Sequence, residues 1–317
     1  MTTPLIAGRT CPLRYRYGAA ALAQAPEQAA DTLYVIGGLY GNRPALAAIE
    51  DMAAREHSTV TLCFNGDFNW FNIDDESFIS INRFVLAHDA IQGNVEAELG
   101  VTGEEAGCGC AYPESVDANV VERSNLIHAR LKGTACRHAA IIGRLAELPM
   151  YRRYRVGECT IGIVHGDAES LAGWRFDVAA LDNAENRGWI EAAFGQANVD
   201  VFASTHTCLP ALQAFHVGTE RKLVINNGAA GMPNFVSQRN GLITRIGVGA
   251  SPSGSLYGSR IGDIHVDALA VDYDHVSWER EFLGNWPPGS PAHRSYYERI
   301  VSGPNHGIER AHRSDRL

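Results

Sequence analysis

The stretch at 64–68, Phe-Asn-Gly-Asp-Phe, constrains this chain more than any other short segment. It follows the apolar run at 60–63, which has the length and composition of a buried strand. Gly66 permits a tight turn, so Asp67 is expected at the carboxyl end of that strand, where ligand sites collect in open α/β sheets. A carboxylate there can hold a hard cation, although a lone Gly-Asp is more often a turn or an Asx cap.

The segment before it predicts a pair of parallel strands. Residues 33–36 form an apolar strand, and a glycine-rich turn follows at 37–42. Pro44 suits the first turn of a helix that extends to about Arg55. A strand, a helix and a second strand make a βαβ unit, whose two strands run parallel.

Three more polar residues follow apolar strands: Asn94, His165 and His206. Singly, Asn94 is most simply a turn residue, and each histidine is as well explained by a structural role in the core. Together with Asp67 they offer one carboxylate, one amide oxygen and two imidazoles, a plausible ligand set for one divalent Mn, Fe or Zn ion. Four such residues at four strand ends favour a metal site.

Between about Leu33 and Phe235, the motifs and their order along the chain resemble those of the calcineurin-like metallophosphoesterases. The matching segments are 36–46, 66–67, 93–94, 164–166 and 205–210, with an Asn-Gly-rich turn at 224–231. The resemblance implies an α/β fold, a four-layer αββα sandwich with a two-metal centre at the sheet edge. Such a centre activates a water and neutralises a phosphoryl group.

The departures from that family concern one metal. Its first motif supplies an Asp and a His, where this chain has Gly38 and Tyr40. The last His of its fifth motif, which serves the same metal, is Cys208 here. The resemblance therefore implies a divergent member that lacks most ligands of the first metal site and keeps the second. The retained ligand set is Asp67, Asn94, His165 and His206.

A further departure concerns proton transfer. The family's third motif continues with a His that assists the leaving group, and this chain has Val95 there. Losing a positioned acid costs about 10²–10⁴-fold in rate unless another group serves or the leaving group is good. The candidate catalytic residues are Tyr40, Asp67, His206 and Cys208.

Cys108 and Cys110, with Cys208, suggest a second metal site or redox chemistry if a cap folds over the cleft. The Cys-Gly-Cys spacing is shorter than a usual zinc knuckle, and small residues in a tight turn are the simpler explanation.

Side chains that closely follow the predicted ligands offer further contacts. Asn69, Trp174 and Arg175 are candidates for substrate binding, since an Arg and an indole can hold a phosphate and a base or sugar. Trp70 and Trp174 are alternatively core aromatics. Asp167 is expected to orient the imidazole of His165.

The chain is expected to form one domain over residues 1–317. A helical cap is predicted at about 97–150, with helices at about 116–131 and 134–147, and a surface tail at about 286–317. Strands at 211–217, 222–226, 241–248 and 264–273 suggest a second, more antiparallel sheet.

Composition narrows the function. A net charge of -9 over 317 residues argues against a nucleic-acid surface, and no apolar run spans a membrane. Seven cysteines without a secretory signal predict a cytoplasmic protein. The sequence thus predicts a metal-dependent hydrolase of phosphate esters, either phosphodiesters or phosphomonoesters, including nucleotides. The alternative is a catalytically silent protein of this fold that binds or senses a small phosphorylated ligand. Oligomeric state is not indicated.

Overall fold

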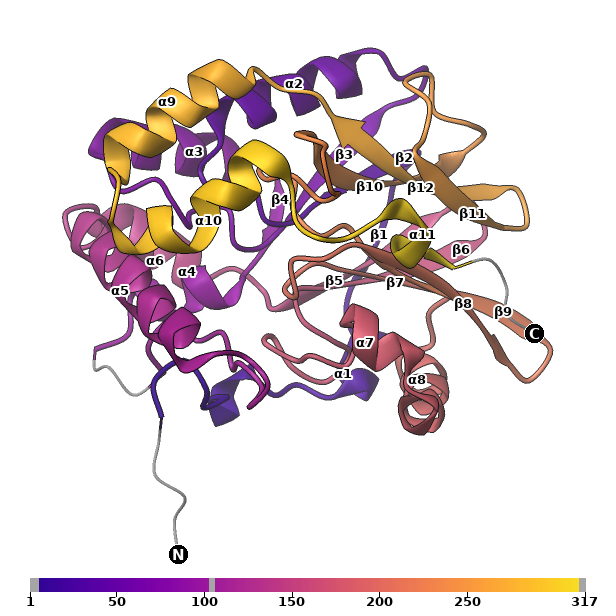
Figure 1. The fold of residues 1–317 in the computed structure, drawn as a ribbon. Helices are drawn as coiled ribbons and strands as arrows, with labels where there is room; N and C mark the ends of the chain where they lie inside the picture. Colours follow the sequence, from indigo (N-terminus) through magenta and orange to yellow (C-terminus); the bar gives the residue numbers. More distant parts are fainter. Residues whose placement is uncertain (1–5, 103–105, 314–317) are drawn as a thin grey trace, which may run out of the picture.

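The computed structural model describes residues 6–102 and 106–313 and shows two β-sheets stacked face to face between layers of helices (Figure 1). Parts of the predicted lead-in, cap and tail, namely residues 1–5, 103–105 and 314–317, lie outside this description.

Both sheets mix parallel and antiparallel strands. Within the described ranges, one sheet has seven strands, in the spatial order β1 (Glu27–Ala29), β5 (Tyr151–Val156), β6 (Cys159–Val164), β7 (Val201–Ser204), β9 (Glu220–Asn226), β8 (Ala211–Val217) and β13 (His312–Arg313). The other sheet has six strands among the described residues. Their spatial order is β11 (Tyr257–Ile261), β12 (Ile264–Val271), β10 (Gly241–Val248), β2 (Thr32–Ile36), β3 (Val60–Asn65) and β4 (Asp89–Ile91).

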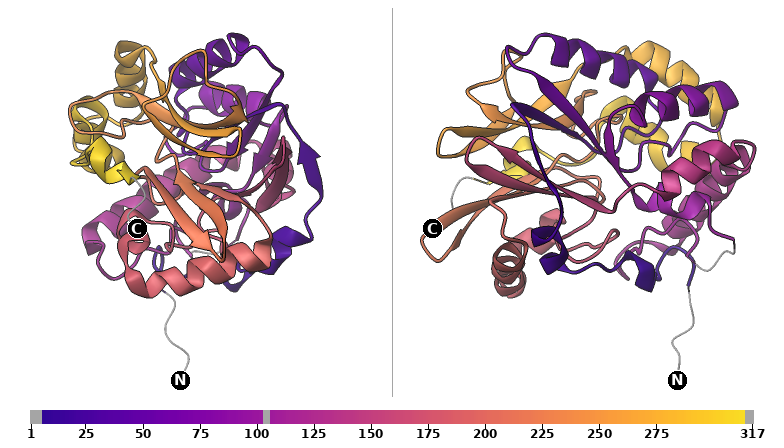
Figure 2. Two further views of the ribbon diagram at one scale, coloured as in Figure 1. Left: turned by 90° about the vertical axis from the view of Figure 1, so that its right-hand side faces the viewer. Right: turned by 180° about the vertical axis from the view of Figure 1, so that it is seen from behind.

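Helices cover the two outer faces and one end of the sheets (Figure 2). Those packed on the six-stranded sheet include α2 (Arg43–Ala54), α3 (Asp75–Val85) and α9 (His275–Asn285). Those on the seven-stranded sheet are α1 (Ala19–Ala23), α7 (Val178–Asp182) and α8 (Ala184–Ala197). The group at one end comprises α4 (Asn94–Leu99), α5 (Ala118–Ala135), α6 (Ala139–Ala146) and α10 (Pro291–Ser302). Two short helices, η1 (Leu13–Tyr15) and α11 (Ile308–Ala311), lie near the ends of the described chain.

Strand β2 shows why the layers form. All five of its residues are buried, as expected for a strand covered on both faces. Tyr34 and Ile36 pack in the cluster beneath the helices, whereas Leu33 and Val35 pack in the cluster between the sheets. Successive side chains of a strand point to opposite faces, so one apolar run can serve both cores. The predicted αββα sandwich is confirmed.

The predicted βαβ unit is present. Strands β2 and β3 pair in parallel, and α2 connects them. The helix begins where Asn42 Oδ1 accepts a hydrogen bond from the Ala45 amide, with Pro44 in its first turn.

The expectation that the strands between 211 and 273 together form a second, more antiparallel sheet was wrong. Strands β8 and β9 join the parallel strand β7, whereas β10 pairs antiparallel with β2 and carries β12 with it. Alternating hydrophobicity indicates that a segment is a strand, but the choice of sheet depends on packing partners far away in the chain.

The region predicted as a cap, about 97–150, contains the end of α4 together with α5 and α6, at one end of the sheets (Figure 1). The segment predicted as a surface tail contains α10, whose Ile300 is buried, and begins with the fully buried Trp286. The Trp286 indole donates a hydrogen bond to the Phe71 carbonyl. This segment therefore packs beside the cap helix α5.

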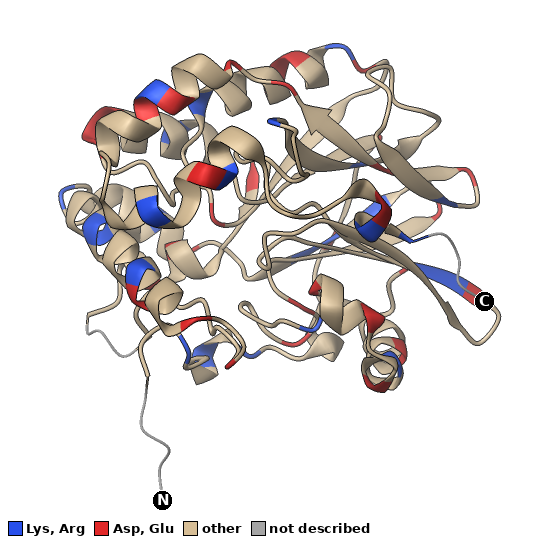
Figure 3. Ribbon diagram, viewed as in Figure 1, with Lys and Arg blue, Asp and Glu red and all other residues tan. Residues whose placement is uncertain are grey.

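Basic and acidic side chains are interspersed over helices and strands (Figure 3). No helix in the described part of the chain is long and apolar enough to cross a membrane.

A buried ion pair links α2's C-terminal side to the six-stranded sheet, and its loss should destabilise the fold. Arg245 on β10 contacts Glu56 through Nε at 2.6 Å and Nη2 at 3.0 Å, and both side chains are 2% exposed. Glu56→Ala would leave the guanidinium buried with less compensation, so we expect a loss of about 3–5 kcal/mol in unfolding free energy. Urea unfolding measures it. An unchanged midpoint would contradict this role.

Candidate metal centre

Two glycines let the loops after β3 and β4 approach one another. A Cβ on Gly66, whose φ is +75°, would clash with the backbone of Gly93 and with Nδ1 of His165. A Cβ on Gly93 would clash with the Asp67 carboxylate. Both positions therefore need glycine, and the close approach brings Asp67 beside Asn94.

The four predicted ligands converge. His165 Nε2 lies 3.1 Å from Asn94 Oδ1, 3.2 Å from His206 Nδ1 and 3.4 Å from Asp67 Oδ2. Ligand atoms of Asp67, His165 and His206 all lie within 4.8 Å of one another, and these side chains are buried. The amide of Asn94, which begins α4 rather than ending a strand, completes the group.

Hydrogen bonds on the far side fix which atom each residue presents. His165 Nδ1–H donates to the Asn65 carbonyl at 2.8 Å, and His206 Nε2–H donates to the Cys110 carbonyl at 3.1 Å. The Asn94 amide nitrogen donates to the Cys108 carbonyl at 2.9 Å. Each residue thus turns a lone pair toward the others, with the histidine tautomers assigned from these partners.

This arrangement suits a cation. Four acceptor atoms face one another, and one proton on His165 could satisfy only part of the group. Tetrahedral ligands at about 2.0–2.2 Å from a metal lie about 3.3–3.6 Å apart. The distances from His165 Nε2, 3.1–3.4 Å, are close to that spacing. The residues present therefore fit a single divalent metal.

The electrostatics show that Asp67 attracts positive charge to the centre of this group. Burial would raise the pKa of the Asp67 carboxyl, but His165 and His206 hold it below its usual range. Burial would lower the pKa of His165, but Asp67 raises it. Burial and then His165 lower the pKa of His206 to about 3. His206 is therefore neutral near pH 7, with its lone pair free of proton competition.

Glu96 positions the ligand loops, and the sequence analysis assigned it no role. Its buried carboxylate accepts hydrogen bonds from the amides of Asp67, Phe68 and Gly93 at 2.8–3.1 Å. Burial and then Asp67 raise its pKa to about 7. Its place three residues after Gly93, which precedes α4, has the spacing of a capping box, and that spacing is the signal that could have identified it.

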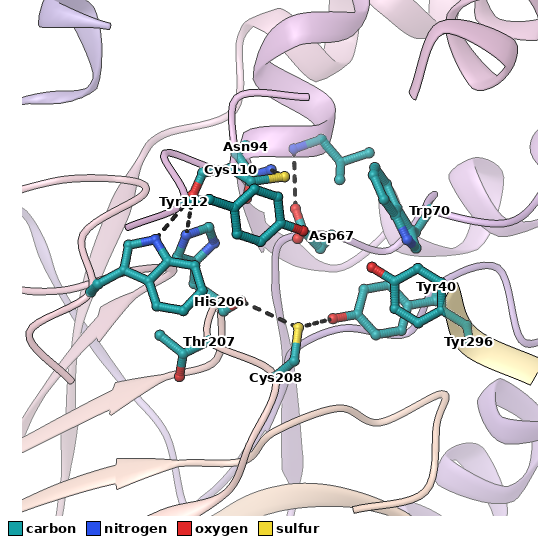
Figure 4. A pocket seen from close by; sticks show the side chains of 12 residues that line it. Tyr40, Asp67, Trp70, Asn94, Cys110, Tyr112, His206, Thr207, Cys208 and Tyr296 are labelled. Carbon is teal, nitrogen blue, oxygen red and sulfur yellow. Dashed lines mark hydrogen bonds between the residues drawn. The ribbon is translucent and has the colours of Figure 1, made fainter. Parts of the chain in front are cut away.

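A pocket of about 150 Å³ opens beside the ligands (Figure 4). Its lining is Tyr40, Asp67, Trp70, Asn94, Val95, Cys110, Tyr112, Trp174, His206, Thr207, Cys208 and Tyr296. No lysine or arginine is among these described lining residues.

Backbone strain concentrates at this pocket. Tyr40, Asp67 and Cys208 have φ between 53° and 62°, and Ala111, between two lining residues, has φ 49°. Non-glycine residues adopt this left-handed conformation at a cost, and such residues cluster at functional sites.

Tyr40 and Cys208 face one another at the wall of the pocket. The Tyr40 hydroxyl lies 3.0 Å from Cys208 Sγ. Burial, and then the neighbouring Cys208, raises the pKa of Tyr40 well above its usual value. Burial also raises the pKa of Cys208. Tyr40 is thus a neutral hydroxyl near pH 7.

The aromatic wall includes two tyrosines that no sequence motif singled out. Tyr112 follows the cysteine loop, and Tyr296 lies on α10, near Trp70. Arg299, one turn further along α10, donates hydrogen bonds to the carbonyls of Pro233 and Cys208.

Several predicted contacts lie elsewhere. Trp174 lines the pocket, but Asn69 and Arg175 do not. Asn69 is buried against Asn82, and Arg175 stacks on Trp189.

The predicted role of Asp167 was wrong. Its carboxylate accepts backbone amides of Glu169, Ser170 and Arg175, while the Asn65 carbonyl holds His165. Such a local turn satisfies a carboxylate without any contact to the imidazole.

The three cysteines do not form one sulfur cluster. Cys108 and Cys110, with Cα atoms 5.4 Å apart, form a disulfide, whereas Cys208 is a free cysteine held by Tyr40.

Comparisons with known proteins show the fold. Neither a scan against protein-family models nor a search of curated proteins finds a match. The structure resembles that of a metallophosphoesterase from Sphaerobacter thermophilus, with a TM-score of 0.53 and 16% identity over 86% of this chain and 100% of that one. It also resembles a hypothetical protein from Pyrococcus horikoshii OT3, with a TM-score of 0.55 and 16% identity over 87% of this chain and 99% of that one. The shared feature is the sandwich of two sheets between helices.

Removing one ligand should abolish metal binding at this centre. His206→Ala deletes the Nδ1 lone pair, and we expect metal affinity to fall by more than about 100-fold, beyond the loss typical of outer hydrogen-bond partners. Mn²⁺ titration of the purified protein measures this. His216→Ala, at an exposed histidine on β8, is the matched control. Equal metal affinity in both variants would refute the ligand set.

Proposed function

We propose that this protein is a metal-dependent phosphoesterase that works with one divalent cation, Mn²⁺, Fe²⁺ or Zn²⁺, and hydrolyses small phosphodiesters. The observation that carries the proposal is the convergence of four acceptor atoms from Asp67, Asn94, His165 and His206. The neighbour from Sphaerobacter thermophilus, named a metallophosphoesterase, supports the reaction class.

A cation in this centre would polarise a phosphoryl oxygen and lower the pKa of a bound water. The chain's own residues would do the rest. Asp67 supplies the negative charge of the ligand set, and the carbonyls of Asn65 and Cys110 hold the imidazoles in the correct orientation. The Tyr40 hydroxyl, neutral and buried, lines the pocket and is held by Cys208 Sγ.

Charge favours diesters over monoesters. One divalent cation with one Asp67 carboxylate leaves a charge of about +1, and the buried Glu96 carboxyl, with a pKa of about 7, can only lower that charge. The described lining residues include no lysine or arginine. A diester carries one negative charge and would be neutralised, whereas a monoester dianion would leave an uncompensated charge in a buried site.

Size and shape favour a compact ester. The cavity of about 150 Å³ is comparable to one that holds a benzene molecule. Tyr112, Trp174 and Tyr296 supply aromatic surface on which a planar group can pack.

A silent ligand-binding protein is the second candidate. The observation that favours it is the apolar Val95, which lines the pocket and can move no proton. Under this reading the metal and the aromatic wall would bind a small phosphorylated ligand without turnover.

The charge argument predicts substrate preference. With one equivalent of Mn²⁺, kcat/KM for methyl p-nitrophenyl phosphate should exceed that for p-nitrophenyl phosphate at least about tenfold, because tenfold corresponds to only about 1.4 kcal/mol. The two esters share a leaving group, so the comparison isolates the charge. A preference for the monoester would contradict the charge argument. Binding of both esters without turnover would support the silent alternative.

The missing acid predicts a dependence on the leaving group. Val95→His places an imidazole in the pocket, and we expect it to speed hydrolysis of methyl phenyl phosphate, a poor leaving-group substrate, by about 10-fold or more. The p-nitrophenyl analogue needs no protonation and should change little. Val95→Ile, which adds bulk without a proton donor, is the control. Equal effects of both substitutions on the phenyl ester would show that proton transfer does not limit the reaction.

A further inference from the structure

The disulfide between Cys108 and Cys110 lies against the candidate metal centre. Its loop is hydrogen-bonded to Asn94 of α4 and to Asn125 of α5. Cys108 is fully buried, and Cys110 lines the pocket. One residue, Gly109, separates the two sulfur-bearing positions. A Cβ on Gly109 would clash with Tyr15, and its φ is +68°. The disulfide closes residues 108–110 into a small ring, and this disulfide ring packs tightly against Tyr15.

The backbone of this ring holds two of the four ligands. The Cys108 carbonyl accepts the Asn94 amide at 2.9 Å, and the Cys110 carbonyl accepts the His206 Nε2–H at 3.1 Å. The Asn94 amide nitrogen also lies 3.5 Å from Cys110 Sγ. A change in this disulfide ring would therefore affect two hydrogen bonds. One orients the Asn94 side chain, and the other sets the tautomer of His206.

A third contact links the ring to the pocket wall. The Trp174 indole donates to the same Cys110 carbonyl at 3.0 Å, and its ring packs on His206 at a centroid distance of 5.3 Å. Figure 4 marks the hydrogen bond between Cys110 and His206 with a dashed line. One peptide group therefore orients a metal ligand and an aromatic wall residue together.

We propose that Cys108 and Cys110 form a redox-active site whose disulfide state holds the metal centre in its binding geometry, and whose reduction by a small dithiol weakens metal binding. The proposal rests on the metal centre proposed above. It takes a thiol reductant as its co-reactant, and Cys110, facing the pocket, is the sulfur that such a molecule can reach.

The reduction balances as a thiol–disulfide exchange. A thiolate of the dithiol attacks Cys110 Sγ, the bond between the cysteines breaks, and Cys108 leaves as a thiolate that takes up a proton. The second thiol of the reductant then attacks its own sulfur in the mixed disulfide and releases Cys110. Two electrons pass to the protein, and the reductant leaves as its disulfide.

The effect should be large enough to measure. Outer hydrogen-bond partners of metal ligands contribute about 10–100-fold to metal affinity. Opening the ring frees the backbone that carries two such partners. We therefore expect Mn²⁺ affinity to fall by about 10–100-fold in the reduced protein.

The experiment compares the oxidised full-length protein with protein reduced by a small dithiol, and the dithiol is removed before measurement. Free Mn²⁺ is quantified by electron paramagnetic resonance, because manganese prefers oxygen and nitrogen ligands and responds little to new thiolates. Differential alkylation with mass spectrometry assigns the redox state of each cysteine. A C108S/C110S double variant should match the reduced protein, and C136S, at an exposed free cysteine, should match the oxidised one.

Each outcome is decisive. Weaker Mn²⁺ binding in the reduced protein and in the double variant supports the proposal. Equal affinity in both redox states, with the His206→Ala loss intact, overturns the redox role and leaves the metal centre standing. If Cys108 and Cys110 remain open to alkylation after treatment with oxidised glutathione, the redox role is also overturned. Mn²⁺ binding in neither state overturns the redox role together with the metal centre.

Discussion

Two hydrogen bonds to backbone carbonyls determine what this site can do. His165 donates to the Asn65 carbonyl and His206 donates to the Cys110 carbonyl, so each imidazole turns its remaining nitrogen inward. Without these bonds either ring could rotate or change tautomer and present an N–H. The fold supplies one carbonyl from the end of β3 and the other from a loop beneath the cap helices. The six-stranded sheet and the cap region thus each contribute one carbonyl to the same centre.

The strained backbone around the pocket has the same origin. Asp67 sits in a left-handed conformation because its loop must pass between Gly93 and the strand end. Glu96 stabilises the loop conformation because its carboxylate accepts hydrogen bonds from three backbone amides. These amides would otherwise be buried without partners. The local cost of strain is offset by hydrogen bonds that also place the carboxylate.

Sequence alone could predict the fold class through the resemblance carried by the ordered motifs, and local patterns could select the four candidate ligands. Apolar runs identify the strands, and Asp67 or His165 directly after such a run must lie at a sheet edge. The sequence could not predict which carbonyl each histidine meets. The partner of His206 is 96 residues away, at Cys110, in a loop without regular structure.

The C-terminal segment shows the same limit. Its Pro, Gly and charged residues are typical of a surface tail, yet Trp286 is fully buried and Tyr296 reaches the pocket. A short amphipathic helix carries no information about which face of the protein it covers. The aromatic wall, and with it the shape of the pocket, is therefore a property of long-range packing.

The central claim is that one cation binds among four named side chains. The most direct test is a crystal structure of the protein soaked with Mn²⁺, with anomalous scattering measured to locate the metal. We predict one strong peak about 2.0–2.3 Å from Asp67, Asn94, His165 and His206. A second peak of equal strength beside Tyr40 and Cys208, or a peak that none of the four ligands touches, would contradict it.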